Sequence, residues 1–143
     1  MSSLPPPSDR FRQQHAHLME LALEIGQMFD ATGQVADAEV CRRKLSAFAG
    51  ALRVHAAMEN GALYPRLLDH PAAEVRDTAR RLLDECGELY DEFHAFLSGW
   101  PSAAAIRAET PRFAREARRV FRKLGARMMK ENDTLYPLAD EHA

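Results

Sequence analysis

Apolar residues recur along the chain at steps of three and four positions, in four long stretches that short turns separate. This spacing places the apolar side chains on one face of an α-helix. It predicts helices near residues 9–31, 36–68, 72–99 and 110–138. No stretch alternates between apolar and polar residues for long enough to indicate a β-strand. We therefore expect an all-α fold, and specifically an antiparallel up-down-up-down four-helix bundle.

Proline and glycine separate these helices. Gly33 follows the first helix, Pro71 opens the third, and Pro101 follows it. Residues 1–8 carry three consecutive prolines and are expected to form a flexible N-terminal arm. The remaining residues, 9–143, are long enough to bury one core and are expected to form a single four-helix bundle domain without a second unit.

The apolar stripe of the second predicted helix runs from Cys41 to Ala62 and is interrupted by His55 and Glu59. These two residues are four positions apart, so they stand one turn apart on the same helix face. Burying an imidazole and a carboxylate without partners is costly. Their spacing lets both side chains reach one metal ion, which makes them a predicted ligand pair.

The segment that contains this pair occurs twice. Residues 55–65 read HAAMENGALYP, and residues 127–137 read RMMKENDTLYP. The two copies align without a gap and share Glu-Asn and Leu-Tyr-Pro, so we interpret them as a duplicated helix ending. The second copy keeps its carboxylate as Glu131 but has Arg127 in place of His55.

Polar or reactive side chains on all the predicted helices fall at one depth of the bundle when residues are counted from the turns. His15 lies in the apolar stripe of the first helix, and Cys86 and Tyr90 lie on the third. His94 falls about two turns beyond that depth. The converging set comprises His15, His55, Glu59, Cys86, Tyr90, Arg127 and Glu131.

These features resemble the hemerythrin-like, or HHE cation-binding, domain family. The resemblance covers residues 11–138. It consists of a histidine early in helix one, the motif His-x-x-x-Glu before Leu-Tyr-Pro in helix two, and the second copy of the repeat, Glu-Asn-x-x-Leu-Tyr-Pro, in helix four. It implies a bundle that holds two iron atoms bridged by two carboxylates. It also implies that Glu59 and Glu131 are those carboxylates, and that His15 and His55 are ligands of one iron.

The ligands that the family uses for the other iron are not matched. Cys86 and Tyr90 stand at the histidine positions of helix three, or Tyr90 and His94 do if the register of that helix is shifted. A thiolate or phenolate there is an alternative way to hold a second ion. We predict at most one non-haem iron ion per chain, or none. The predicted ligands are His15, His55, Glu59 and Glu131, with Cys86, Tyr90 and His94 as weaker candidates.

Arg127 stands at the position of the family's helix-four histidine. A guanidinium has no lone pair to offer a metal, and it stays protonated. We expect Arg127 to form an ion pair with Glu131 or Glu59, in the place where the second cation would lie. Its charge would also make a second divalent ion nearby unfavourable.

Composition narrows the range of partners. The net charge is −2, which argues against a nucleic-acid-binding or membrane-surface protein. A basic run within residues 112–130 is matched by an acidic run within residues 84–92 on the adjoining helix, so we expect the two runs to pair with each other. The chain has two cysteines, no signal-like N-terminus and no apolar run of about 18 residues. These features predict a cytoplasmic protein without a membrane segment.

Two functions are compatible with this pattern. The first is a non-haem iron protein that binds or senses a small species such as dioxygen, nitric oxide or peroxide, as the resemblance implies. The second is a metal-free bundle that serves as an interaction or signalling module, with an ion-pair cluster around Arg127. No residue is predicted to be catalytic, and we expect binding rather than an enzymatic reaction.

Overall fold

The computed structural model describes residues 8–142. Residues 1–7, which make up nearly all of the predicted N-terminal arm, and residue 143 lie outside the described residues. Phe29 and Val35 form an isolated β-bridge, and residues 8–142 contain no strand, so the predicted all-α class is confirmed. The elements, with η1 and η2 denoting π-helical turns, are α1 (Asp9–Gly26), α2 (Ala38–Met58), η1 (Glu59–Leu63), α3 (Tyr64–Leu68), α4 (Ala73–Gly99), α5 (Ala103–Ala108), α6 (Thr110–Lys130), η2 (Glu131–Leu135) and α7 (Tyr136–Glu141).

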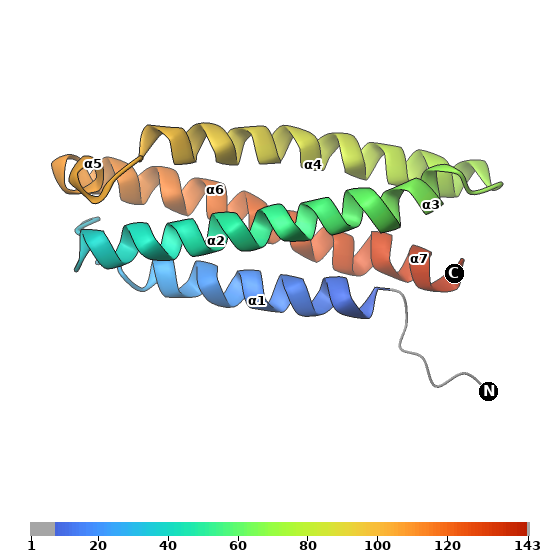
Figure 1. The fold of residues 1–143 in the computed structure, drawn as a ribbon, viewed down its shortest axis with the longest axis horizontal. Coiled ribbons are helices and arrows are strands. Elements are labelled where there is room, and N and C mark those ends of the chain that lie inside the picture. The colour runs from blue at the N-terminus through green and yellow to red at the C-terminus, as the bar shows by residue number, and fades with distance from the viewer. Residues whose placement is uncertain (1–7, 143) are drawn as a thin grey trace.

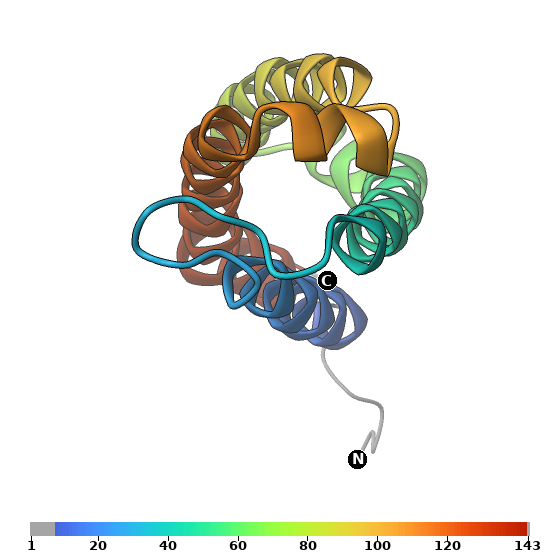
Figure 2. The ribbon, with the colours of Figure 1, turned by 90° about the vertical axis from the view of Figure 1, so that its left-hand side faces the viewer.

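The long helices lie side by side with their axes in nearly the same direction (Figure 1). α2 continues through η1 into α3, and α6 continues through η2 into α7, so each of these series forms one rod. Seen from one end, α1, α2, α4 and α6 surround a common axis (Figure 2). α1 packs against α2 and α6, and α4 packs against α6 and α3. The molecule is therefore a helical bundle. Its interior is lined by four rods, namely α1, α4 and these two composite helices.

The first helix ends at Gly26, earlier than the predicted end at residue 31. The Asp30 Oδ1 atom accepts a hydrogen bond from the backbone N–H of Gln34 at 2.9 Å, and this bond holds the chain in a loop instead. Gly33, inside that loop, has a φ of +83°, a conformation that favours glycine. The glycine thus shapes the loop and does not terminate the helix itself.

The segment between α4 and α6 contains α5, a short helix where the sequence predicted only a linker. Its first turn is capped by the Ser102 side chain, because Ser102 Oγ accepts a hydrogen bond from the Ala105 N–H at 3.2 Å. Ile106 on this helix is completely buried. The linker therefore closes one end of the core.

The buried apolar side chains form two separate clusters, one toward each end of the bundle. The larger cluster contains Phe48, Phe93 and Phe113, and the smaller contains Leu82 and Leu135. Between the clusters lies a layer of polar or reactive side chains, at the common depth that counting from the turns predicted. Its buried members include His15, His55, Glu59, Cys86 and Glu131.

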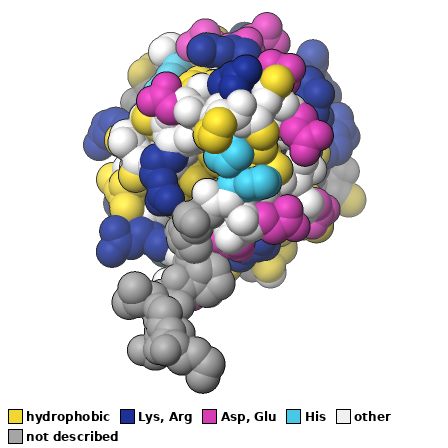
Figure 3. All heavy atoms as spheres, turned by 90° about the vertical axis from the view of Figure 1, so that its right-hand side faces the viewer, with side chains coloured by type: hydrophobic (Ala, Val, Ile, Leu, Met, Phe, Trp, Pro, Cys, Tyr) yellow, Lys and Arg dark blue, Asp and Glu magenta, His cyan; other side chains and the backbone are white. Residues whose placement is uncertain are grey.

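The surface at the end of the bundle near α3 and α7 carries histidines among cations and anions that are mixed together (Figure 3). The rings of His70 and His142 approach each other there, with centroids 4.6 Å apart. This face therefore shows no extended patch of one charge sign. Among the described residues, no helix combines the length and apolar character that crossing a membrane requires.

Candidate metal centre

Each copy of the duplicated segment forms a π-helical turn that begins at its glutamate. The Tyr64 N–H donates to the Glu59 carbonyl, five residues back, and the Tyr136 N–H donates to the Glu131 carbonyl in the same way. The next residue in both copies is a proline, which lacks an N–H and whose ring would clash with the carbonyl four residues back. A wider turn before the proline relieves that clash. The repeat therefore produces the same local distortion twice.

The extra residue in each π turn changes which side chains face the interior. An uninterrupted α-helix would place Ala62 in the buried stripe after Glu59, as the sequence pattern predicted. Ala62 is instead exposed, and Leu63 and Tyr64 are buried. Tyr136, the equivalent of Tyr64 in the second copy, is also buried. The prediction for Ala62 was wrong, and two tyrosines point inward.

Four side chains converge between the apolar clusters, and each is only 1% exposed: His15, His55, Glu59 and Glu131. The two Nε2 atoms of the histidines are 3.0 Å apart. His55 Nε2 lies 3.1 Å from Glu59 Oε1, and His15 Nε2 lies 3.2 Å from Glu131 Oε1. One ligand atom from each of the four residues lies within 4.8 Å of all the others. This arrangement is compact enough to surround a single ion.

The other ring nitrogen of each histidine has an amide partner. His15 Nδ1 lies 2.9 Å from Asn132 Oδ1, and His55 Nδ1 lies 2.5 Å from Gln14 Oε1. An amide oxygen can only accept, so each Nδ1 carries a proton and donates it. Nε2 is then the nitrogen of each ring that is left to face the interior, where it either carries a proton and donates to a glutamate or offers its lone pair to a cation. With neither a proton nor a cation, the two Nε2 lone pairs would face each other across 3.0 Å, which is unfavourable.

Each tyrosine of the repeat reaches across to the glutamate of the other copy. Tyr136 OH donates to Glu59 Oε2 at 2.6 Å, and Tyr64 OH donates to Glu131 Oε2 at 3.0 Å. The Oε1 atoms of the glutamates therefore face the histidines, whereas their Oε2 atoms accept hydrogen bonds from the tyrosines. These bonds fix the orientation of both carboxylates, as the partners of metal ligands commonly do.

Burial is the largest influence on both glutamates, and by itself it raises the pKa of a carboxyl group. In Glu131 burial prevails over the hydrogen bond with His15, and the nearby charge of Glu59 adds to the effect, so the pKa is raised. In Glu59 the hydrogen bond and charge of His55 outweigh burial, so the pKa is lowered. The two carboxyl groups therefore differ in their affinity for a proton, as expected when two like charges share a buried site.

Cys86 and Tyr90 reach the predicted depth, but His94 does not. Cys86 Sγ lies 3.8 Å from Glu131 Oε2, and the half-buried Tyr90 lines a small cavity beside the cluster. Burial raises the pKa of the Cys86 thiol and of the Tyr90 hydroxyl, so both hold their protons firmly. His94 is exposed, because Phe93 takes the buried position of that turn. The alternative register that used His94 is therefore not adopted.

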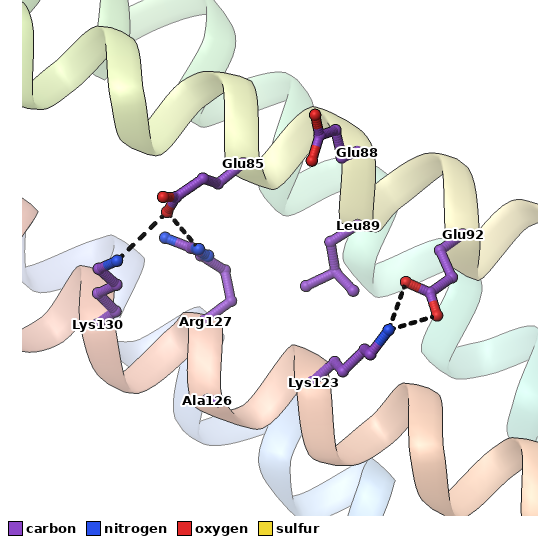
Figure 4. Close-up of a pocket in the computed structure, with 8 residues that line it drawn as sticks. All are labelled: Glu85, Glu88, Leu89, Glu92, Lys123, Ala126, Arg127 and Lys130. Carbon is purple, nitrogen blue, oxygen red and sulfur yellow. Dashed lines mark hydrogen bonds and ion pairs between the residues drawn. The ribbon is translucent and has the colours of Figure 1, made fainter.

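Arg127 does not pair with Glu131 or Glu59, and that predicted ion pair was wrong. Its Nη2 donates to Glu85 Oε2 at 2.5 Å, at the outer edge of the interface between α4 and α6 (Figure 4). The hydrogen bond from Arg127 lowers the pKa of Glu85. The reason lies in the rotation of α6: Met128 occupies the buried stripe and is 5% exposed, so Arg127 lies on its flank.

The predicted pairing between the charged runs of α4 and α6 is present. Lys123 Nζ lies 2.9 Å from Glu92 Oε1, and Lys130 Nζ lies 3.3 Å from Glu85 Oε2 (Figure 4). Cations of α6 are thus neutralised within the molecule by acids of α4. This pairing accounts for part of the basic run without a nucleic-acid partner.

Comparison with known families agrees with the geometry. Residues 7–139 match the family model described as the hemerythrin HHE cation binding domain. The chain belongs to the hemerythrin HHE family. No curated protein and no solved structure matches the chain significantly. The family match spans nearly the whole chain and includes every residue of the cluster.

The donor set fits the cation that the hemerythrin family name implies. Two imidazole nitrogens that bind one ion at about 2.1 Å and at right angles lie about 3.0 Å apart. The Nε2 atoms of His15 and His55 are separated by 3.0 Å. A cation between them would remove the conflict of their lone pairs and offset the charges of the two carboxylates. Imidazole and carboxylate together are donors that suit non-haem iron.

Four polar residues of this hemerythrin-type site were not predicted from the sequence. Three of them lie in the repeated segment, and their place in the repeat could have indicated a role, but none was assigned to them from the sequence. The fourth, Gln14, follows the exposed Gln13 on α1, and nothing in the sequence pattern distinguishes it from a surface residue. The four are Tyr64, Tyr136, Asn132 and Gln14.

Proposed function

We propose that this chain is a non-haem metal-binding protein that holds one ion between His15, His55, Glu59 and Glu131. The observation that carries the proposal is the pair of Nε2 atoms 3.0 Å apart, each on a ring whose Nδ1 proton is donated to an amide oxygen. The Tyr136 hydroxyl lies 3.0 Å from His15 Nε2 and reaches only that ring, whereas a cation would contact the lone pairs of both rings, and the neighbouring carboxylates favour a cation of higher charge than a proton. The long rods and short connections support the antiparallel up-down-up-down arrangement of a hemerythrin-type four-helix bundle.

A single ion is supported by how the glutamates are held. A carboxylate that bridges two ions uses one oxygen for each of them. Here the Oε2 atoms of Glu59 and Glu131 accept hydrogen bonds from Tyr136 and Tyr64. Arg127, in the place of a family histidine, has no lone pair for a second ion. Both features favour one ion per chain.

Iron is the metal we propose, because the family and the nitrogen and oxygen donors both suit it. Bound iron would supply a Lewis-acid centre with open positions for a small ligand such as dioxygen, nitric oxide or peroxide. The residues of this chain hold the ion, fix the histidine tautomers and keep the site between two apolar clusters. The activity we propose is binding or sensing, and no residue is assigned a catalytic role.

The alternative function, a metal-free interaction module, included an ion pair between Arg127 and the glutamates and was favoured by the altered second-metal site. Arg127 pairs with Glu85 instead. Arg127 therefore does not balance the buried carboxylates of Glu59 and Glu131. The alternative loses its proposed ion-pair cluster and keeps only the altered second-metal site in its favour.

Elemental analysis of protein purified without a chelator or an affinity tag tests the proposal. We expect close to one iron per chain, and almost none in His55→Ala. The matched control is His94→Ala, which removes an exposed histidine and should keep the metal. A wild-type protein that binds no metal even when iron is supplied would refute the metal function. Two ions per chain would refute the single site.

A further inference from the structure

Met58 is the last residue of α2 and directly precedes Glu59, the first residue of η1. Its side chain is partly exposed, and it also packs against the smaller apolar cluster. α1 lies alongside α2 (Figure 1), and Gln14 of α1 donates from Nε2 to the Sδ atom of Met58 at 3.0 Å. The sulfur of Met58 is therefore in contact with a residue that orients the proposed metal ligands.

Gln14 connects this sulfur to His55. The oxygen of the same amide, Gln14 Oε1, accepts from His55 Nδ1 at 2.5 Å, and His55 Nε2 lies 3.1 Å from Glu59 Oε1. The side-chain amide is a planar unit, like the peptide group, so its nitrogen and oxygen cannot move independently. A displacement of Gln14 Nε2 by Met58 therefore also displaces the acceptor that orients His55.

A methionine sulfur in this position is open to oxidation. A thioether takes up one oxygen atom without first losing a proton, and the product is methionine sulfoxide. A thiol reacts as its thiolate, which burial disfavours, and Cys41 and Cys86 are both buried. Gln14 lines a surface groove of about 360 Å³ between α1 and α2, so the contact between Gln14 and Met58 lies near solvent. Met58 is therefore more open to a small oxidant than either cysteine.

We propose that Met58 is an oxidation site through which hydrogen peroxide lowers the metal affinity of the cluster. Peroxide transfers one oxygen atom to Sδ: its O–O bond breaks, an S–O bond forms, the thioether is oxidised to the sulfoxide, and peroxide is reduced to water. Because the modification acts on the proposed ion, this inference rests on the proposed function and gives that site a regulation. Met58 and Gln14 are positioning residues here, since they act through His55.

The distance of 3.0 Å between Gln14 Nε2 and Met58 Sδ leaves no room for an added oxygen atom. A hydrogen bond from an N–H group to an oxygen already needs about 2.9 Å, so an oxygen between the two side chains pushes them apart. An oxygen on the other side of the sulfur makes Met58 polar and weakens its packing against the smaller apolar cluster. Either product disturbs the partner of Gln14, and His55 then loses its fixed orientation.

The test treats the metal-free full chain with hydrogen peroxide, which catalase then removes. Peptide mass spectrometry locates the added oxygen. Competition with a chromogenic chelator gives the dissociation constant of zinc, which has no redox chemistry of its own. We expect sulfoxide at Met58 and a zinc dissociation constant about tenfold higher, as for the loss of other contacts that orient a ligand. Methionine sulfoxide reductases should restore the original dissociation constant.

Variants are each compared with themselves before and after oxidation. Met58→Leu keeps an apolar side chain of similar volume, and peroxide should no longer change its zinc affinity. The matched control is Met129→Leu, which removes a methionine that is 49% exposed on α6 and should keep the full response. Gln14→Leu should not respond either, because its connection to His55 is already lost. A response in Met58→Leu as large as in the wild type would overturn the proposal.

The ¹⁵N NMR signals of the His55 ring, identified by their loss in His55→Ala, give a readout without metal. They should shift when metal-free wild type is oxidised and stay in place in Met58→Leu; no shift with Met58 oxidised would overturn the connection through Gln14.

The outcomes also separate this inference from the proposed function. Unchanged zinc binding after complete oxidation of Met58 would overturn the regulation and leave the metal function standing. The same holds if Met58 stays reduced while the exposed Met19 and Met129 are oxidised. A reduced wild-type protein that binds no metal would refute the metal function and, with it, this regulation.

Discussion

Single atoms of Gln14 and Asn132 decide which nitrogen of each histidine points into the site. Their amide oxygens accept from His55 Nδ1 and His15 Nδ1, so that both Nε2 atoms face the interior of the site. Without these acceptors an imidazole could carry its proton on either nitrogen. The amides would therefore orient both Nε2 atoms for the proposed cation before it binds.

Gln14→Leu should weaken metal binding by about tenfold to a hundredfold, because His55 loses the partner that fixes its tautomer and ring orientation. Gln13→Leu makes the same change at an exposed neighbour on α1 and should have little effect. Competition with a chromogenic chelator measures both dissociation constants. Equal affinities for the two variants would show that Gln14 does not orient His55.

Tyr136→Phe tests the bond that holds Glu59. The phenylalanine keeps the ring but removes the hydroxyl that donates to Glu59 Oε2 at 2.6 Å. The buried Oε2 atom of Glu59 then lacks its donor, and the free energy of unfolding of the metal-free protein should fall by roughly 1.5–3 kcal/mol. Urea denaturation near neutral pH measures it. An unchanged midpoint would mean that Glu59 gains nothing from this hydroxyl.

At the scale of elements, the helices were predictable but the π turns were not. Apolar periodicity identified every long helix because one face of each packs against the others. It failed at Ala62 because it assumes an unbroken α-helix, and η1 shifts the buried face by about 100°. Likewise, Arg127 shares a turn with Met128, and only packing decided which of them faced the core. The pairing of Arg127 with Glu85 depends on the rotation of α6 about its axis, so the spacing of residues along the sequence could not predict it.

Pro65→Ala tests whether the proline causes the π turn. Alanine restores an N–H and removes the ring, so an ordinary α-helical turn becomes possible after Glu59. Tyr64 would then turn away from Glu131, and metal affinity should fall by about tenfold or more while helix content is retained. Pro71→Ala, in an exposed turn, is the control. Circular dichroism and chelator competition give the two readouts.

A Pro65→Ala protein with wild-type affinity would show that packing alone holds η1. The second copy offers an independent repetition, since Pro137 follows Tyr136 in the same way. If the repeat works as its geometry indicates, Pro137→Ala should affect Glu59 through Tyr136. In this arrangement each tyrosine donates to the glutamate of the other copy. Each proline substitution should therefore affect the glutamate of the opposite copy, whereas two separate sites would each be affected by their own proline.

At the scale of the whole molecule, the polar layer divides the core into two apolar clusters. His15, His55, Glu59 and Glu131 bring three of the four rods together at that layer, with Cys86 of the fourth beside them. Without an ion, this layer buries charges that only protons and hydrogen bonds compensate. An ion would therefore join the rods where apolar packing is interrupted.

Metal should accordingly raise the thermal stability of the whole bundle. A ligand that binds only the folded state at a hundred times its dissociation constant stabilises by about 2.7 kcal/mol. For a domain of this size, that corresponds to a rise in Tm of roughly 6–10 °C. Calorimetry with and without Zn²⁺ or anaerobic Fe²⁺ measures it.

The variants decide whether this stabilisation comes from the proposed ligands. His55→Ala should lose the rise in Tm, because Nε2 of one histidine is removed, whereas His94→Ala should keep it, because that side chain is exposed. Mg²⁺ should produce no rise, since it prefers oxygen ligands and an octahedron with several waters. A rise that persists in His55→Ala would place the metal elsewhere on the molecule, and the four rods would then be held by packing alone.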